Sequence, residues 1–335
     1  MKDVALRAGV SIQTVSNLVN RRQHLMTGET RLRVEEAMTD LGYHPNMSAR
    51  GLRSARTSTL GFLVLDPHVA FLADPLTDLL IAGAGDVARE RGYSLLIHGG
   101  ALGEPDPRFL APVLESRVDG ALVLLAGEEQ LRLWYVKQLM DLQVEFVLFD
   151  QPMDDPSVSV VRAADRDAGR RLAAYLIAKG HRRIAFIAAR VPWAVVEERH
   201  RGYREALDAA GIPIMPELEL FEAGWEPAGG GEMALKVLGR GDPPTAIMCG
   251  SDVLALGALK ALREAGLRVP EQVAVTGFDD FLFSEYIDPP LTTVKVPGYE
   301  MGRAGAEILI GRLEGDEPAE RQKVLPVALC LRASA

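Results

Sequence analysis

A chain of 335 residues, 48% of them hydrophobic and 25% charged, is expected to fold into two or three globular domains. No apolar run approaches the roughly 20 residues of a membrane-spanning helix, and the N-terminus has no apolar signal-peptide core, so we expect a cytoplasmic protein with no membrane partner. Cys249 and Cys330 lie far apart without clustered histidines, which argues against a disulfide framework or a metal site. We expect no cofactor.

The net charge of -9 is distributed unevenly. Residues 1–60 hold nine Lys or Arg and five Asp or Glu, a net charge of +4, whereas the rest of the chain carries −13. A basic head on an acidic body is typical of a protein whose head alone meets a polyanion. A chance fluctuation in a short window explains the same charges equally well.

Residues 2–42 predict three short amphipathic helices in a helix-turn-helix arrangement. The first covers residues 2–8 and ends at Gly9, a turn residue. The second follows Ser11, an N-cap whose hydroxyl accepts from a backbone N–H. The third starts after Thr27. It is expected to bury four residues on one face: Val34, Ala37, Met38 and Leu41.

The second helix has an unusual outer face, because it carries almost no charge. Val15, Leu18 and Val19 repeat at i, i+3 and i+4 and are expected to face the core. The opposite face then consists of Ile12, Gln13, Thr14, Ser16 and Asn17. Base edges in the major groove are recognised by neutral donors, acceptors and methyl groups as well as by cations. The pattern favours a helix that reads DNA; a solvated face on an ordinary three-helix bundle is the alternative.

The head resembles the DNA-binding head of the lactose-repressor (LacI/GalR) family. The similarity rests on D-V-A-x-x-A-G-V-S-x-x-T-V-S-x-x-x-N at residues 3–20, T-R at residues 30–31, A-M-x-x-L-G-Y-x-P-N at residues 37–46 and A-R-x-L at residues 49–52. The resemblance implies a homodimer on palindromic double-stranded operator DNA. It gives as base-reading candidates Ile12, Gln13, Ser16 and Asn17, and as phosphate contacts Ser11, Thr14 and Asn20.

Residues 46–57 form an Arg-, Ser- and Ala-rich segment between the head, residues 1–45, and the body. It is either a flexible linker or a hinge that folds on DNA, with Arg50 and Arg53 at phosphates or in the minor groove. Leu52 suits a wedge that opens a base step, and the resemblance supports that role.

From residue 58 onward, strands and helices alternate. Apolar strands are expected at residues 59–66, 93–98, 118–126, 144–150, 182–189, 245–252 and 272–280. Helices are expected at residues 78–92, 107–115, 129–141, 164–180, 197–211 and 251–266. Strands buried on both faces and spaced by helices predict two doubly wound lobes with parallel sheets. A ligand of such lobes is expected between them, at the carboxyl ends of the strands.

Polar and aromatic side chains follow several of these strands. Asp66, Asp150 and Asp279 each come at or directly after a strand, and Trp193 follows another. Carboxylates accept from hydroxyls and indole rings stack on C–H faces, so the set suits a polyhydroxylated ligand. Each aspartate taken singly is more often a helix cap or a loop residue; their recurrence favours the ligand site.

The body also resembles the LacI/GalR family, through K-G-H-R-R-I at residues 179–184, R-x-x-G-Y at residues 199–203, P-T-A-I-x-x-x-S-D-x-x-A-L-G at residues 244–257 and G-F-D-D at residues 277–280. This implies an α/β core like type I periplasmic binding proteins, with three crossovers between an N-lobe (about 58–160 and 292–322) and a C-lobe (about 161–291 and 323–335). The implied effector contacts are Phe71, Asp150, Trp193, Arg199, Trp225, Ser251 and Asp279.

Two other functions fit the sequence less well. An exported solute-binding protein shares the body but needs no DNA-reading head. The loose G-x-G-x-x-A match of a nicotinamide enzyme, at residues 83–88, lies inside a helical run and not in a turn after a strand. We therefore expect a dimeric transcriptional regulator, most simply a repressor, controlled by a small polar effector such as a sugar, and no enzymatic activity.

Overall fold

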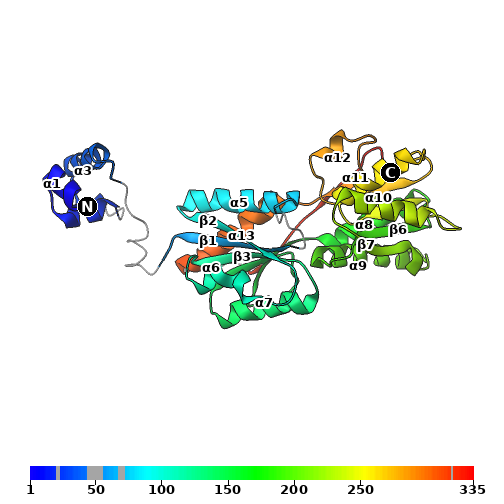
Figure 1. The fold of residues 1–335 in the computed structure, drawn as a ribbon, viewed down its shortest axis with the longest axis horizontal. Helices are drawn as coiled ribbons and strands as arrows, with labels where there is room; N and C mark the ends of the chain where they lie inside the picture. Colours follow the sequence, from blue (N-terminus) through cyan, green and yellow to red (C-terminus); the bar gives the residue numbers. More distant parts are fainter. Residues whose placement is uncertain (20–22, 44–55, 67–71, 318–319) are drawn as a thin grey trace. The chain divides into compact units, whose positions relative to one another are not determined.

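The computed structural model describes residues 1–19, 23–43, 56–66, 72–317 and 320–335. The chain divides into two units, Met1–Thr57 and Ser58–Ala335, whose elements are labelled in Figure 1. We call them the head and the body. The expected boundary at residue 45 and most of the expected hinge at 46–57 lie outside the described residues.

The head is built from three helices, α1 (Lys2–Ala8), α2 (Ile12–Val19) and α3 (Gly28–Asp40), with a short 3-10 turn, η1 (Gln23–Leu25), before α3. Gly9 closes α1 in the left-handed region, at φ +64. The Ser11 hydroxyl accepts from the Thr14 N–H at 3.1 Å at the start of α2, and the Thr27 hydroxyl accepts from the Thr30 N–H at the start of α3. These local signals are those expected from the sequence. The head core contains Val4, Val15 and Val34, all essentially inaccessible to solvent.

Two side chains of the head differ from the expectation. Ser16 is 8% exposed and so is buried, not on the outer face of α2. It lies about 60° around the helix from Val19, so it flanks the apolar stripe. Leu41 is 47% exposed, because α3 ends at Asp40 and Leu41 is its C-cap; Tyr43, whose N–H donates to the Met38 carbonyl, packs on the core there.

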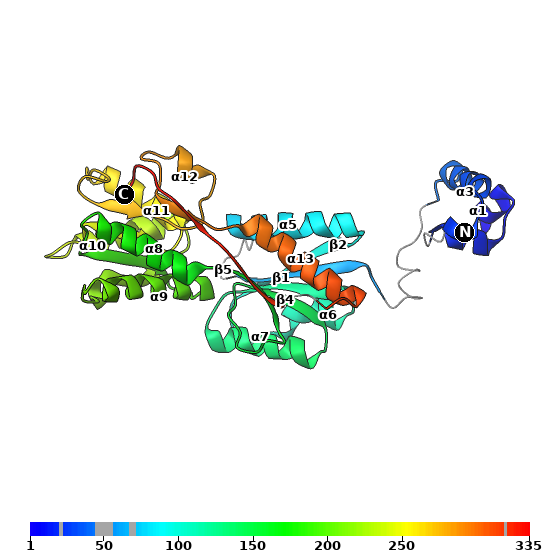
Figure 2. The same ribbon diagram turned by 180° about the vertical axis from the view of Figure 1, so that it is seen from behind.

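The first lobe of the body has a six-stranded parallel sheet in the order β11-β5-β4-β3-β1-β2. Its strands are β1 (Thr59–Asp66), β2 (Ser94–Ala101), β3 (Gly120–Leu125), β4 (Glu145–Phe149), β5 (Ser159–Ala163) and β11 (Gln322–Leu325). One face is covered by α5 (Pro75–Arg91) and α13 (Gly298–Glu314), as Figures 1 and 2 show. The other face is covered by η2 (Pro107–Leu110), α6 (Ala111–Leu114) and α7 (Glu129–Asp141).

Both faces of this sheet are apolar, as the continuous hydrophobic strands predict. Along β1, Phe62 and Val64 pack in the cluster that includes Leu80 of α5, whereas Leu63 and Leu65 pack in the cluster that includes α7. The period of two therefore separates two cores, one on each side of the same strand.

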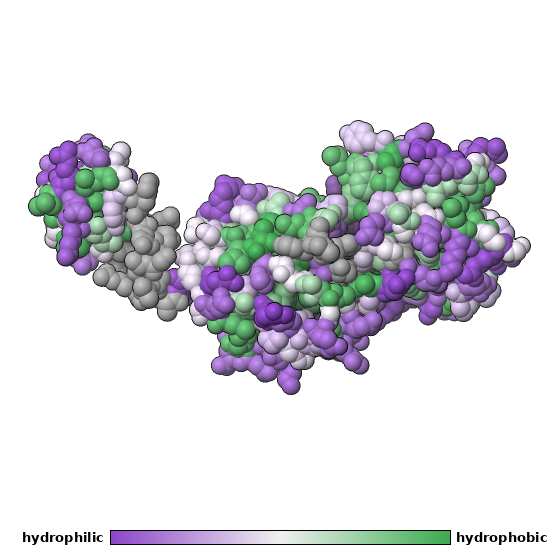
Figure 3. All heavy atoms as spheres, in the orientation of Figure 1, coloured by the Kyte–Doolittle hydropathy of each residue, from purple (hydrophilic) through white to green (hydrophobic). Residues whose placement is uncertain are grey.

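The second lobe has a four-stranded parallel sheet in the order β7-β6-β8-β9. The strands are β6 (Ile184–Ala189), β7 (Glu219–Ala223), β8 (Ala246–Cys249) and β9 (Ala274–Thr276). The helices of this lobe are α8 (Asp165–Ala178), α9 (Ala194–Ala209), α10 (Pro227–Leu238), α11 (Asp252–Glu264) and the short α12 (Phe283–Tyr286), with η3 (Pro216–Leu218) before β7. The face over α9 is mostly hydrophilic (Figure 3), in keeping with its outward Glu and Arg side chains.

In the described part of the body, the chain passes between the lobes three times. It leaves the first sheet after β5 for α8, returns from β10 (Thr293–Lys295) to α13, and leaves again from β11 to β12 (Ala328–Cys330). Strands β10 and β12 pair with each other in an antiparallel ribbon. The lobe boundaries expected near residues 160 and 322 cut through β5 and β11, which both belong to the first sheet, so the passages lie a few residues later.

Candidate functional site

The outer face of α2 is a row of neutral donors and acceptors. Gln13 Nε2 donates to Asn17 Oδ1 at 3.0 Å, one helical turn away, and the hydroxyls of Ser11 and Thr14 lie 2.9 Å apart. Ile12, 47% exposed, adds an apolar contact beside them. The exposed amides and hydroxyls are groups that read base edges or hold phosphates. Ser16 is buried and does not belong to this exposed row.

Five residues singled out from the sequence lie outside the described residues, and the roles expected for them stay predictions. They are Asn20, Arg50, Leu52, Arg53 and Phe71.

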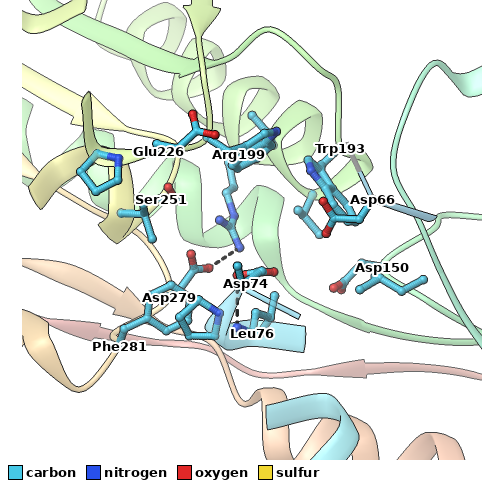
Figure 4. A pocket seen from close by; sticks show the side chains of 18 residues that line it. Asp66, Asp74, Leu76, Asp150, Trp193, Arg199, Glu226, Ser251, Asp279 and Phe281 are labelled. Atoms are coloured by element: carbon cyan, nitrogen blue, oxygen red, sulfur yellow. Dashed lines mark hydrogen bonds and ion pairs between the residues drawn. The ribbon is translucent and has the colours of Figure 1, made fainter. Parts of the chain in front are cut away.

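A cavity of about 230 Å³ lies between the two lobes of the body. Polar lining residues come from the carboxyl ends of strands: Asp66 ends β1, Asp150 follows β4, Ser251 follows β8 and Asp279 follows β9. The structure brings six of the seven expected effector contacts into this one cavity (Figure 4): Asp150, Trp193, Arg199, Trp225, Ser251 and Asp279.

Arg199 is the electrostatic centre of the cavity. Its Nε donates to Asp165 Oδ1 at 2.8 Å, one terminal nitrogen donates to the Gly250 carbonyl at 2.9 Å, and the other donates to Asp279 Oδ1 at 2.8 Å. The guanidinium also lies over the Phe278 ring, 3.9 Å from its centroid. Although burial opposes it, Asp279 and Asp165 raise the pKa of Arg199 above its usual value, so the cation is permanent and already neutralised.

Close packing of two helices places Arg199 there. Gly169 of α8 lies against α9 so tightly that a Cβ on it would stand 2.2 Å from the Arg199 carbonyl oxygen. Asp165, one turn before Gly169, therefore faces the Arg199 side chain. The pair α8 and α9 thus fixes the arginine before any ligand arrives.

Asp279 connects the cavity to a strand that joins the lobes. Its N–H donates to the Val294 carbonyl at 2.8 Å, and its own carbonyl accepts from the Val296 N–H at 3.3 Å. These two bonds lie on either side of Lys295, the last residue of β10. The residue has φ +110, outside the ordinary range of an aspartate. Burial raises the pKa of Asp279 well above its usual value, while Arg199 acts in the opposite direction.

Asp150 is a polar residue of the cavity with spare hydrogen-bonding capacity. It is 6% exposed, and its Oδ1 has no hydrogen-bond partner among the described residues. Burial, followed by the charge of Asp165, raises the pKa of Asp150 to about 8. Its carboxyl is therefore largely protonated at neutral pH and can both accept and donate. A buried, unsatisfied oxygen is costly, so a ligand that bonds to it gains affinity.

Two tryptophans supply the apolar part of the cavity. The rings of Trp193 and Trp225 lie 6.1 Å apart and nearly perpendicular, at 88°. Leu124 comes from the first lobe and Phe281 from the second. Flat rings beside carboxylates suit a ligand with apolar C–H faces and hydroxyl edges.

Several lining residues of the cavity were not among the expected contacts, including Asp74, Glu226 and Phe281. Asp74 accepts from the Leu76 N–H at 3.2 Å and so caps α5, and burial raises its pKa. The sequence signal, Asp before Pro75, is that of an ordinary helix start, and it does not show that the cap also faces a cavity. Asp66, which the sequence places at a strand end, also lines the cavity.

The described residues hold no group of three His, Cys, Asp or Glu side chains arranged to bind a metal ion. None of the helices described is long and apolar enough to cross a membrane. The cavity instead presents several carboxyl groups and one arginine that is already paired, which disfavours an anionic ligand and favours donors such as hydroxyls.

Comparison with protein families gives two matches. Residues 1–46 match the family model described as bacterial regulatory proteins, lacI family, and residues 173–335 match the periplasmic binding protein-like domain. The transcriptional regulator CelR of Thermobifida fusca is 34% identical over 334 residues, 99% of this chain and 96% of the relative. The transcriptional repressor PurR of Aliivibrio salmonicida is 31% identical over 324 residues, 96% of this chain and 94% of the relative.

Solved structures agree with this. A complex of the regulator CelR with cellobiose has a TM-score of 0.75 at 33% identity and covers 100% of this chain and 99% of its own. The lac repressor dimer bound to operator and the anti-inducer ONPF has a TM-score of 0.86 at 28% identity, over 99% of this chain and 97% of its own.

Proposed function

Because the chain belongs to the LacI family of bacterial regulatory proteins, we propose that it is a cytoplasmic repressor whose dimer binds a palindromic operator under the control of a carbohydrate effector. Like the relatives PurR and CelR, the chain is a DNA-binding transcriptional regulator and not an enzyme. The observation that carries the proposal is the neutral, exposed face of α2, with its Gln13–Asn17 pair, on a helix-turn-helix head.

Operator reading is assigned to α2. Gln13 and Asn17 present amide donors and acceptors, Ile12 presents an apolar side chain, and Ser11 and Thr14 stand at the helix N-terminus, where phosphates are favoured. Ser16 is left out of the base-reading set because its side chain is buried. Two-fold dimers place one such helix in each half-site, which is why a palindrome is expected.

Selection of random DNA duplexes by the purified chain, at one fixed salt concentration, tests this proposal. We expect enrichment of a palindrome, and loss of that enrichment in Gln13→Ala. Enrichment of non-palindromic sequences would contradict the proposal. So would a selection that enriches no sequence, whether or not the ligands tested below are present.

The effector is assigned to the interlobe cavity, as an uncharged hydroxyl-rich molecule. Asp66, Asp74, Asp150 and Glu226 outnumber the cations, and Arg199 already has two carboxylate partners. Asp150 Oδ1 offers a free acceptor, and the two indole rings suit the C–H faces of a sugar ring. The cellobiose complex of the related regulator supports a carbohydrate.

A thermal-shift series tests the effector class. Neutral sugars, beginning with cellobiose and glucose, are compared with their phosphorylated and carboxylated analogues on the full chain. We expect the largest stabilisation from a neutral sugar, because a ligand that binds only the folded state raises Tm. Trp225→Ala should abolish that shift while operator binding is retained. A larger shift from an anionic analogue would refute the assignment.

A further inference from the structure

A buried arginine of the first lobe has its carboxylate partner in the second lobe. Arg132 of α7 is 1% exposed, and its terminal nitrogen lies 3.2 Å from Glu197 Oε2 of α9. Among the described residues, Glu197 is the carboxylate within ion-pair distance of Arg132. A buried guanidinium is costly without a counter-charge, so the first lobe depends on the second for this one.

The same arginine reaches the second lobe by a backbone route. Its other terminal nitrogen donates to the Gly127 carbonyl, and the Gly127 N–H donates to the Pro192 carbonyl at 2.9 Å. Gly127 lies in the loop between β3 and α7 at φ +100, a backbone conformation that favours glycine. Arg132 therefore contacts one end of a second-lobe segment through Glu197 and the other end through Gly127.

That segment is one wall of the effector cavity. Between Pro192 and Glu197 lie three residues that line it, Trp193, Val195 and Val196. Trp193 is the N-cap residue of α9, and its ring lies in the pocket together with Arg199 (Figure 4). Arg199 follows two residues after Glu197 on the same helix. The first lobe thus holds both ends of the stretch that carries the indole ring.

We propose that Arg132 and Glu197 are positioning residues, an interlobe pair that holds the Trp193 wall in place and sets how readily the two lobes part on that side. Without the carboxylate, the buried Arg132 charge is better accommodated when water reaches it, so loss of the pair favours parted lobes. The proposal rests on the proposed function in one respect: the movement of the lobes is what controls the head.

Glu197→Gln is the central variant, and Glu198→Gln is its matched control. The two positions are neighbours on α9 and undergo the same loss of charge, but Glu198 pairs with Arg201 of its own helix at 2.5 Å. Hydrogen–deuterium exchange on the full chain, without DNA or sugar, measures whether loss of the pair loosens the backbone on that side of the cavity. We expect the Gly127 amide and the peptide 192–199 to exchange about fivefold faster or more in Glu197→Gln and to be unchanged in Glu198→Gln. Equal exchange in the two variants overturns the proposal.

Arg132→Met supplies the second side of a double-mutant cycle. In that background Glu197→Gln should add almost nothing, because the partner charge is gone; a full additional effect overturns the pairing. A second experiment measures the affinity of each variant for the selected operator and for the stabilising sugar. Glu197→Gln should change these affinities about fivefold or more, while the Tm of the head stays unchanged. Faster exchange with both affinities unchanged would reduce the pair to a purely structural role and overturn the positioning.

The two proposals can fail separately. If the DNA selection yields no operator and no sugar binds, the proposed function fails, while the exchange experiment still decides whether the pair holds the wall.

Discussion

Individual residues of the cavity were predicted well where they stand at the ends of strands. Asp66, Asp150 and Asp279 stand at or shortly after expected strands, so the expected sheet alone places them at one edge, whereas Ser251 was implied only by the resemblance. Arg199 and Trp225 came from the resemblance instead, because nothing in a helical pattern shows which of many arginines is buried. The expectation of an exposed Ser16 side chain was wrong for a related reason. A helical wheel does not show how far a neighbouring helix covers the flank of the apolar stripe.

Asp150 should make stability depend on pH. Its pKa is raised to about 8, so between the ordinary aspartate pKa and pH 8 the folded chain binds more protons than the unfolded one, and the free energy of unfolding falls as pH rises. The slope for one proton reaches about 1.4 kcal/mol per pH unit. The melting temperature of Asp150→Asn minus that of the unmodified chain should therefore grow from pH 5 to pH 8. A constant difference over this pH range would contradict this.

Arg199 should matter more to stability than any exposed arginine. Arg199→Met leaves Asp165 and Asp279 buried without their cation and the Gly250 carbonyl without its donor, which costs about 3–5 kcal/mol. Arg201→Met, on the same helix but in an exposed pair, should cost less than about 1 kcal/mol. Urea denaturation of the two variants gives the comparison, and similar losses would show that the buried network contributes little.

At the scale of elements, the strongest sequence signals gave the most accurate boundaries. The helix at residues 129–141 was located to the residue, and α1 ended at the glycine that predicts its end. The short strands β5, β7, β10, β11 and β12 and the helices α10 and α13 were not singled out. Strand β11 is largely exposed, and α10 contains Gly229, Gly230 and Gly231, a poor helix-forming run that packs closely on α11. These strands and helices form because of tertiary packing, which the local sequence pattern does not show.

The α2 element can be tested apart from the rest of the head. Gln13→Ala removes an exposed amide but introduces a good helix former, so the head should stay folded. Loss of one base contact costs about 1–3 kcal/mol, which lowers operator affinity roughly 5- to 150-fold. Thr39→Ala on the exposed face of α3 is the control and should bind as the unmodified chain does. Binding by both variants at equal strength would remove α2 from operator reading.

For the whole molecule, the two-lobed architecture followed from the alternation of strands and helices, but the order of the strands did not. The sheet order β11-β5-β4-β3-β1-β2 places the chain's penultimate strand beside β5, a pairing of residues about 160 positions apart. No local pattern specifies so distant a partner. The interlobe ion pair of Arg132 and Glu197 was missed for the same reason, because each residue alone reads as an exposed helical charge.

The assembled protein is predicted to be a dimer. Two heads are needed for the two halves of a palindrome, one for each half-site. Light scattering of the full chain at micromolar concentration should give the mass of two chains, unchanged over a tenfold dilution. The mass of one or of four chains would contradict the prediction.

The late position of α13 and β11 has a consequence for how the protein is made on the ribosome. Most of the second lobe, residues 165–291, is one contiguous stretch, but the first lobe, begun at β1, lacks its edge strand and the helix beside α5 until residues 298–325 appear. At about 5–20 residues per second, its half-built sheet waits roughly 7 to 32 seconds after β5 with part of an apolar face uncovered. The nascent chain is then most open to chaperones and proteases, and a message truncated before codon 298 yields a regulator with a finished head and an unfinished body.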